Sequence, residues 1–312
     1  MSKRAVVFAY HDVGVRCLKV LASVVGLEIP LVVTHKDAPG ENIWFGSVLE
    51  TAQEMNLRCE TPENPNDPEF VTELKKIRPD FIFSFYYRHM LTPEVLASAK
   101  EYGFNIHGSL LPKYRGRVPV NWAILKGERE TGATLHLMTA KPDAGDIVDQ
   151  MAVPILDEDV AIDVFRKVVC AAEIVLQRSL PKILSGDFPR IKNDLARGSY
   201  YGGRKKEDGR IDLTQPAEHI HNLIRAVAPP YPGAFVPVPE LGEFFIYRSR
   251  LSPVVSSEEK FPVIFGRQRG YYLQTEKGRS LEILECGVGS EAPRKAEDFF
   301  NHIKVQLPWR WK

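Results

Sequence analysis

The chain reads FNIHGSLLPKYRGR over residues 104–117. This stretch begins as a strand, because an aromatic residue and the β-branched Ile106 stand in a short apolar run. It ends as a loop, because the Pro and Gly that follow cannot continue a strand ladder. Side chains two apart on a strand share a face, so Asn105 and His107 are predicted to project together. These two residues alone do not distinguish a reactive pair from two satisfied polar groups at a sheet edge.

Strand-like and helical patterns alternate around this stretch. The runs AVVFAY at 5–10, IPLVVT at 29–34 and FIFSFY at 81–86 are short and apolar, as buried parallel strands are. Apolar residues at helical spacing separate them, and the longest helical pattern covers 161–184. The sequence therefore predicts an α/β domain with a Rossmann-like, mostly parallel sheet and helices on both faces.

The first strand is expected to lead into a turn at 11–14 and then a helix over 15–24. A dinucleotide-binding turn would carry G-x-G-x-x-G at this place, so that the backbone can approach a pyrophosphate. This turn offers only Gly14, and a dehydrogenase is therefore not favoured. A second helix is predicted over 44–55.

The composition changes after residue 185. A Gly-rich, charged stretch at 202–209 has the character of a linker or a binding loop. Short β-rich runs with turn residues follow from 235 to 284, which predicts a small antiparallel barrel of the OB-like kind. The tail from residue 292 carries no readable pattern. We expect a catalytic domain at 1–188, a linker at 189–205 and a C-terminal β-barrel domain at 206–312.

The overall composition bounds the function. A chain of 312 residues with 44% hydrophobic and 26% charged residues is typical of a globular protein of about two domains. The net charge of +1 creates no general attraction to nucleic acid or to an anionic membrane. No apolar segment long enough to span a bilayer is evident. Four scattered cysteines without a C-x-x-C pair predict no metal site and fit a reduced, cytoplasmic protein.

Polar residues follow the predicted strands where open α/β sheets bind their ligands. His11 follows the first strand, His89 the fourth, and Asp143 lies in the loop after the sixth. Acyl transfer to an amine needs a donor for the developing oxyanion and a group that exchanges a proton. The Asn105 amide can donate, His107 can exchange the proton, and Asp143, if close, would orient the ring. The fold should bring these groups to one edge.

Several motifs together resemble the folate-dependent formyltransferase family. Asn105-Ile106-His107 with the turn at 109–112 and Arg115-Gly116 resembles its signature, and the segment 143–147 resembles its second motif. The segments 8–12, 83–89 and 225–235 are most similar to formyltransferase domains of the ArnA type, which act in lipid A modification and polymyxin resistance. The resemblance covers nearly the whole chain. It implies a transferase that moves a formyl group from 10-formyltetrahydrofolate to a nucleotide-linked amino sugar. In enzymes of the ArnA type, this acceptor is UDP-4-amino-4-deoxy-L-arabinose.

The resemblance also implies roles for individual residues. Asn105, His107 and Asp143 take the catalytic positions of the family. The folate contacts it implies are His89, Met90, Leu91, Arg117, Thr139, Ala140, Lys141, Pro142 and Asp143. The candidate acceptor contacts are Tyr10, His11, Arg204 and Tyr231, of which Arg204 would meet a diphosphate and Tyr231 would stack on a base. Structural packing is the alternative for all four. His136, inside a predicted strand at 133–138, is interpreted as a satisfied structural histidine.

Three alternatives stay open at this point. Methionyl-tRNA formyltransferase shares both motifs, but its polyanionic substrate requires many basic contacts. The stretch DAPGENIW at 37–44 contains no lysine or arginine where that family has a basic loop, which favours a small-molecule acceptor over nucleic acid. A dTDP- or GDP-linked amino sugar is the second alternative. A folate- or nucleotide-binding module without catalysis is the third. The sequence does not indicate the oligomeric state.

Overall fold

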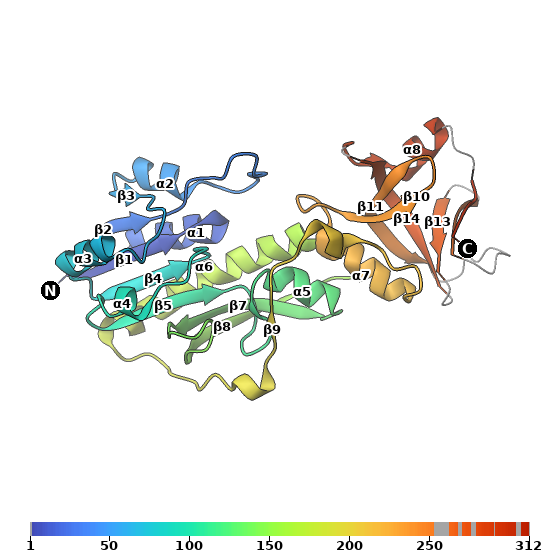
Figure 1. Ribbon diagram of the computed structural model, residues 1–312. Helices are drawn as coiled ribbons and strands as arrows, with labels where there is room; N and C mark the ends of the chain where they lie inside the picture. The colour runs from blue at the N-terminus through green and yellow to red at the C-terminus, as the bar shows by residue number, and fades with distance from the viewer. Residues whose placement is uncertain are drawn as a thin grey trace. The chain divides into compact units, whose positions relative to one another are not determined.

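The computed structural model describes residues 2–252, 262–267, 270–275, 279–289, 291–303 and 307–311 (Figure 1). Its contacts divide the chain into two compact units. The first unit comprises Met1–Pro119, Glu130–Val153 and Arg166–Gly202. The second comprises Val120–Arg129, Pro154–Phe165 and Gly203–Lys312.

The first unit is built on a sheet with the strand order β3-β2-β1-β4-β5-β7-β8. The strands are β1 (Lys3–Ala9), β2 (Leu27–Val33), β3 (Cys59–Glu60), β4 (Phe81–Phe85), β5 (Tyr102–His107), β7 (Glu130–Leu137) and β8 (Ile147–Pro154). Pairing is parallel from β3 to β5, and β7 then runs antiparallel to β5. The prediction of a Rossmann-like, mostly parallel sheet is confirmed.

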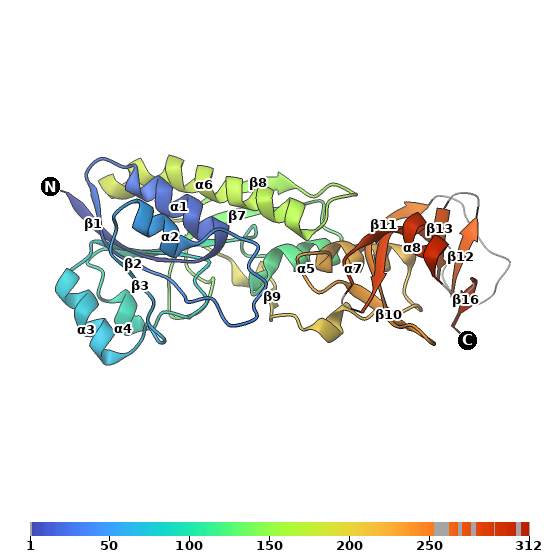
Figure 2. The same ribbon diagram turned by 90° about the horizontal axis from the view of Figure 1, so that it is seen from above.

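Helices cover both faces of this sheet, as Figure 2 shows. They are α1 (His11–Ala22), α2 (Val48–Glu54), α3 (Pro68–Ile77), α4 (Pro93–Leu96) and α6 (Ala161–Ser185). Val71 of α3 and Val95 of α4 pack with the strand residues Val6, Phe8 and Ile82 in one buried cluster. The neighbouring strand residues alternate to the opposite face. There α1 and α6 lie against the sheet.

Two helices begin at different residues from those that the sequence pattern predicts. The first helix starts at His11, so the expected turn at 11–14 is helical. A Cβ at Gly14 would lie only 3.1 Å from Cβ of Ala9, so this glycine lets α1 pack tightly on the end of β1. The second helix starts at Val48 instead of residue 44, because Ser47 caps it by accepting a hydrogen bond from the Glu50 N–H at 3.2 Å.

The segment that follows α6 returns to the sheet of the first unit. Ile147 and Ile191 exchange two backbone hydrogen bonds of 2.8 and 2.9 Å. Further on, β9 (Tyr200–Tyr201) pairs in parallel with β6 (Arg115–Gly116), after the short 3₁₀ helix η1 (Leu195–Arg197). These contacts attach residues 189–202, which the sequence analysis interprets as linker, to the stretch that follows β5.

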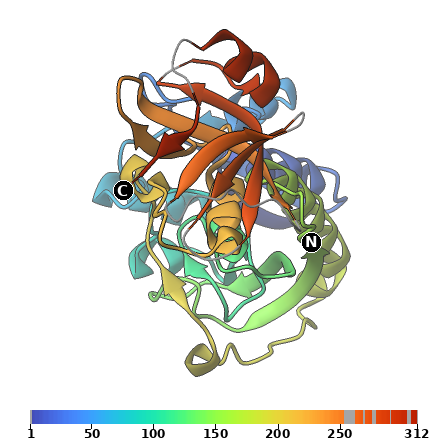
Figure 3. The same cartoon turned by 90° about the vertical axis from the view of Figure 1, so that its right-hand side faces the viewer.

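The second unit is an antiparallel, barrel-like sheet with its own helices (Figure 3). Its strand order is β10-β11-β14-β13-β12-β16, and β15 pairs with β14. The elements are α5 (Pro119–Leu125), η2 (Lys206–Gly209), α7 (Ala217–Val227), β10 (Ala234–Val238), β11 (Gly242–Ser252), β12 (Val263–Arg267), β13 (Gly270–Gln274), β14 (Ser280–Val288), β15 (Arg294–Lys295), α8 (Ala296–His302) and β16 (Trp309–Arg310). The predicted C-terminal barrel is confirmed in this barrel-like form.

The tail that carries no readable pattern contributes to the core of this barrel. Phe299 and Phe300 of α8 and Trp309 of β16 all contact the ring of Phe244, with centroid distances of 5.5, 5.9 and 5.1 Å. Because these aromatic residues are brought together by long-range packing, local periodicity did not reveal them. Among the described residues, none of the helices has the length and apolar composition that crossing a membrane requires.

Candidate active site

His107 ends β5 with oxygen atoms opposite both of its ring nitrogens. Nε2 donates to the carbonyl oxygen of Tyr114 at 2.7 Å, and Nδ1 lies 3.5 Å from Oδ1 of Asp143. Only 8% of the His107 side chain is exposed. Because a carbonyl and a carboxylate both accept, this arrangement suits a ring that carries protons on both nitrogens. The geometry can therefore hold a positive charge at this position.

Asn105 is hydrogen-bonded to a second histidine, His136, which also lies near Asp143. Nδ2 of Asn105 donates to Nε2 of His136 at 3.0 Å, and Nδ1 of His136 donates to the Leu137 carbonyl at 2.8 Å. Nε2 of His136 also lies 3.6 Å from Oδ1 of Asp143. His136 is buried and hydrogen-bonded through both ring nitrogens, as a satisfied histidine is, and antiparallel pairing places it directly opposite Asn105. One hydrogen of the Asn105 amide is thus engaged, and the amide nitrogen has a second one.

Asp143 connects the two histidines. Its Oδ1 faces both rings, and its Oδ2 accepts from the Gly116 N–H at 2.9 Å. Burial by itself would raise the pKa of Asp143, but the adjacent His107 charge and the Gly116 N–H hold the pKa well below its usual range. The carboxylate is therefore ionised and fixed in orientation.

The loop that carries Asp143 reaches His107 by folding back. Because β7 is antiparallel to β5, its last residue, Leu137, lies opposite Phe104, toward the start of β5. Gly145 then approaches the Leu137 carbonyl so closely that a Cβ would lie 1.9 Å from the oxygen. Asp143 itself has a φ of 49°, a left-handed conformation that is uncommon for a residue with a side chain. Such a conformation persists only where surrounding contacts hold it.

Asn193 supplies such contacts, and the sequence analysis did not identify it. Its Nδ2 donates to the carbonyl oxygens of Asp143 at 3.0 Å and of Gly145 at 3.2 Å, and the residue is 6% exposed. Asn193 stands 50 residues from Asp143, in the segment interpreted as linker. No local pattern marks it, because its importance arises from a long-range contact.

A buried hydrogen-bond network fixes the turn after β5. Thr134 Oγ1 donates to the Ser109 carbonyl at 2.6 Å and accepts from the Leu111 N–H at 3.1 Å. Gln150 Nε2 donates to the Leu111 carbonyl at 2.9 Å and to Thr134 Oγ1 at 2.8 Å. The Ser109 hydroxyl donates to the Lys113 carbonyl at 2.6 Å, so it serves as a hydrogen-bonding group of the turn. The network holds the Tyr114–Gly116 backbone that contacts His107 and Asp143.

An aromatic cluster lies beside Gly108, directly after β5. A Cβ at Gly108 would lie 2.0 Å from the Tyr86 hydroxyl oxygen, so only glycine leaves room for that side chain. The Tyr86 ring lies 6.3 Å from the ring of His11, which stacks on Phe45 at 3.9 Å and meets the edge of Trp44 at 4.6 Å. Burial, assisted by the positive charge of Arg88, lowers the pKa of His11 to about 3. His11 is therefore a neutral ring at physiological pH.

Tyr10 and the folate positions differ in exposure. Tyr10 is 4% exposed, and its hydroxyl donates to Asp37 at 2.6 Å, which gives this side chain a structural partner. Met90 is 54% exposed, whereas Leu91 beside it is buried in the sheet core. His89, Thr139, Ala140, Lys141 and Arg117 are exposed, and Pro142 is half-buried. The Thr139 hydroxyl donates to the Lys141 carbonyl at 2.9 Å and shapes the loop.

Arg204 and Tyr231 belong to the second unit. The Arg204 guanidinium lies over the Trp122 ring, 4.9 Å from its centroid, and Nη2 donates to the Asp208 carbonyl at 2.9 Å. Burial lowers the pKa of Arg204, and its Nε has no hydrogen-bond partner among the described residues. Burial also raises the pKa of Tyr231, which is hydrogen-bonded to the side chain of Asn121. Asn105, His107 and Asp143 all belong to the first unit.

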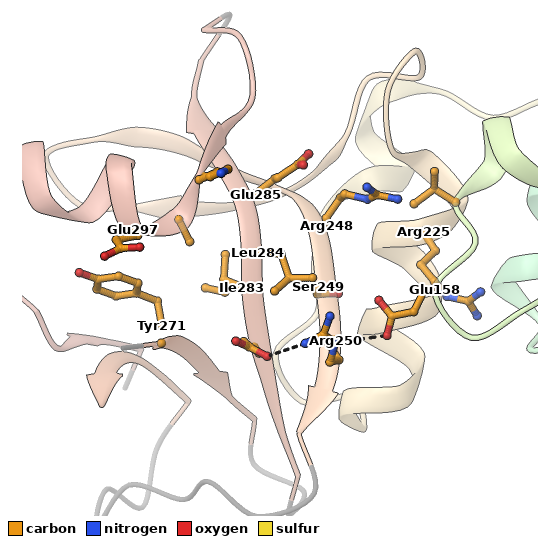
Figure 4. Close-up of a pocket in the computed structure, with 15 residues that line it drawn as sticks. Glu158, Arg225, Arg248, Ser249, Arg250, Tyr271, Ile283, Leu284, Glu285 and Glu297 are labelled. Atoms are coloured by element: carbon orange, nitrogen blue, oxygen red, sulfur yellow. Dashed lines mark ion pairs between the residues drawn. The ribbon is translucent and has the colours of Figure 1, made fainter. Parts of the chain in front are cut away.

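A cavity of about 530 Å³ in the second unit is a separate feature (Figure 4). Arg250 in its wall lies 3.4 Å from Glu158 and 3.6 Å from Glu282, measured between charged atoms. Opposite charges in this wall neutralise one another, and no residue of the Asn105–His107–Asp143 group lines it. Among the described residues no group of three or more His, Cys, Asp or Glu side chains is placed to hold a metal ion.

The first unit is a Rossmann-like sheet, and the second is barrel-like. At the last parallel strand of the first unit, an amide and an imidazole lie close to an ionised carboxylate. Together these features define a class of group-transfer enzymes. The chain belongs to the formyl transferase family. The family described as formyl transferase matches residues 17–180, and its C-terminal domain matches residues 204–304. The protein is accordingly an enzyme that transfers formyl groups.

Solved structures of several formyltransferases are similar to the chain. An N-formyltransferase from Helicobacter canadensis, in complex with folinic acid and dTDP-3-aminofucose, is 22% identical with a TM-score of 0.71, over 91% of this chain and 99% of the other. The sugar 3N-formyltransferase WlaRD, with dTDP and 5-N-formyl-THF, is 22% identical with a TM-score of 0.69, over 94% and 100%. A 4-N formyltransferase from Francisella tularensis is 22% identical with a TM-score of 0.65, over 78% and 96%. At this identity the likeness establishes the fold.

Proposed function

We propose that this enzyme transfers the formyl group of 10-formyltetrahydrofolate to the amine of a nucleotide-linked amino sugar. The observation that carries the proposal is the Asp143 carboxylate, which lies against His107 and near His136, the hydrogen-bond partner of Asn105. The similar structures that contain a folate together with a dTDP ligand support this choice of substrates. We further propose that the reaction takes place in the cytoplasm and needs no metal.

The residues implied for the folate fit a flat, anionic molecule. Met90 exposes 54% of its surface and offers an apolar contact for a ring. The exposed Arg117 offers a cation for a carboxylate, and the segment 139–142 offers backbone hydrogen-bonding groups. We therefore assign His89–Leu91, Arg117 and Thr139–Asp143 to the folate. When bound, the folate supplies an activated formyl group.

The three catalytic candidates then divide the chemistry. The second amide hydrogen of Asn105 donates to the formyl oxygen as negative charge develops on it. The positive form of the His107 ring stabilises the same negative charge, and proton exchange between the ring and the reacting amine requires one ring nitrogen to leave the oxygen that it faces in this structure. Asp143, held in its ionised form, keeps the ring in orientation and balances its charge. No covalent nucleophile in the chain is required.

The acceptor that we propose is UDP-4-amino-4-deoxy-L-arabinose, which would place the reaction in lipid A modification and polymyxin resistance. The support is the resemblance of the segments 8–12, 83–89 and 225–235 to ArnA-type domains. Arg204 is our candidate for its diphosphate, and Tyr10, His11 and Tyr231 are candidates for its sugar and base. A dTDP-linked amino sugar is the second candidate acceptor, because dTDP ligands occupy two of the similar structures.

A direct assay tests the proposal. The protein is incubated with 10-formyltetrahydrofolate and, in turn, with UDP-, dTDP- and GDP-linked amino sugars and with methionyl-tRNA, and formylated product is measured by mass spectrometry. We expect product with a nucleotide sugar, and most rapidly with UDP-4-amino-4-deoxy-L-arabinose. The variant His107→Ala serves as the inactive control. Product with methionyl-tRNA alone would overturn the proposal.

A further inference from the structure

Arg115 lies between the two backbone groups that contact the catalytic side chains. The carbonyl oxygen of the preceding Tyr114 accepts from His107, and the N–H of the following Gly116 donates to Asp143. The Arg115 N–H itself donates to the Ser199 carbonyl at 3.0 Å, within the β6–β9 pair. The position of its backbone is therefore tied to the catalytic group on both sides.

The side chain of Arg115 is buried without a matching negative charge. The residue is 9% exposed, and its Nε has no hydrogen-bond partner. No carboxylate in the described part of the chain forms an ion pair with it. Its guanidinium carbon lies 6.0 Å from the centroid of Tyr200, which is the outer limit of a cation–π contact and compensates little. Nε alone is fully buried without a partner, so part of the guanidinium stays open to solvent, and a charge with so little hydration and no counter-charge is unfavourable.

Two features indicate how the charge is satisfied. Tyr200, whose ring lies 6.0 Å from the guanidinium carbon, is 57% exposed, so this side of Arg115 faces the protein surface. A guanidinium also offers paired N–H groups that match the two oxygens of a phosphate or a carboxylate. A ligand that arrives from solvent with such a group would supply the missing partner.

We propose that Arg115 is an oxyanion-binding residue of the active site, which receives a phosphate or carboxylate group of a substrate. The inference rests on the proposed function, in which both substrates carry such a group: the nucleotide sugar has a diphosphate and the folate has glutamate carboxylates. The shared chemistry is an oxyanion held by the guanidinium. Arg115 is distinct from Arg117, whose guanidinium is exposed and which we assign to the folate.

Binding measurements on variants of the full chain test the inference. The variants are Arg115→Gln and Arg115→Met, with Lys113→Gln as the control, because Lys113 is an exposed cation two residues away. Isothermal titration calorimetry uses UDP, dTDP and 5-formyltetrahydrofolate as probes. Loss of a charge-assisted hydrogen bond raises Kd by about 10- to 100-fold. A rise for UDP or dTDP identifies the diphosphate as the occupant, and a rise for the folate identifies the carboxylate.

A stability measurement separates a ligand site from a structural arginine. Because Arg115 is unpaired in the ligand-free protein, Arg115→Met is expected to keep or raise its Tm. If a variant fails to fold, Arg115→Lys replaces it, since it keeps the charge and loses the paired donors. Unchanged Kd values for all three probes in a folded variant overturn the inference. Failure of the proposed function is seen separately, as wild-type protein that formylates no amino sugar.

Discussion

Replacing Asn193 tests whether the conformation of the loop that carries Asp143 depends on hydrogen bonds from this side chain. Asn193→Ala removes two hydrogen bonds, to the carbonyl oxygens of Asp143 at 3.0 Å and of Gly145 at 3.2 Å. A buried hydrogen bond contributes about 1 kcal/mol net, so the two together stabilise this loop conformation by about 2 kcal/mol. If that free energy keeps Asp143 against His107, its loss lowers kcat about 30-fold.

A second substitution sharpens the expectation. Asn193→Asp replaces the donating amide by a carboxylate that faces the same two carbonyl oxygens. Since carbonyl and carboxylate oxygens repel one another, we expect a larger loss of kcat than with alanine. Steady-state kinetics of formyl transfer measure both effects, and thermal unfolding measures the accompanying change in stability.

Ser179→Ala is the matched control. Ser179 lies on α6, is 5% exposed and donates to Asp149 Oδ2 at 3.1 Å. The alanine variant therefore also loses a buried hydrogen bond, but one that involves none of Asn105, His107 and Asp143. We expect a reduced Tm with unchanged kcat. A wild-type kcat in Asn193→Ala would refute the reasoning, because the loop would then hold Asp143 in place without this contact.

Three further perturbations test the site. Asn105→Ala is expected to lower kcat roughly 100- to 1,000-fold, as loss of an oxyanion donor does, with a normal circular dichroism spectrum; near-full activity would contradict the assignment. Asp143→Asn should lower kcat sharply. Burial raises the pKa of Asp143, but the His107 charge and its other partners lower it by more, so the folded-state pKa lies below that of an unfolded carboxyl group. The ionised carboxylate therefore stabilises the wild type above the unfolded-state pKa, and this stability is lost as the pH falls. The asparagine variant should therefore show a flatter dependence of Tm on acid pH, and identical curves would contradict the ion pair. Gly108→Ala would place a Cβ 2.0 Å from the Tyr86 hydroxyl oxygen and must displace that ring, so we expect it to lower activity. Adding Tyr86→Phe removes the clashing oxygen and should restore part of that activity. Failure of this rescue would exclude the clash as the cause of the loss.

Much of the first unit follows from the sequence alone. The apolar runs at 5–10, 29–34 and 81–86 predict buried parallel strands, because a strand covered on both faces has apolar residues at nearly every position. The spacing of Asn105 and His107 on one strand predicts that they project together. The motifs around them indicate formyl transfer. These features are local, so they can be recognised without knowledge of which strands are neighbours.

Only the tertiary structure determined which groups surround that pair. The antiparallel pairing of β7 with β5 places His136 opposite Asn105, and the fold-back of the following loop returns Asp143 to His107. Asn193 and the unpaired Arg115 gain their significance from neighbours that are distant in the sequence or from the absence of a counter-charge. Periodicity records the burial of a position but not the identity of its partner. The sequence therefore determined the strand and the two side chains that define the chemistry, and the tertiary structure determined how they are positioned and charged.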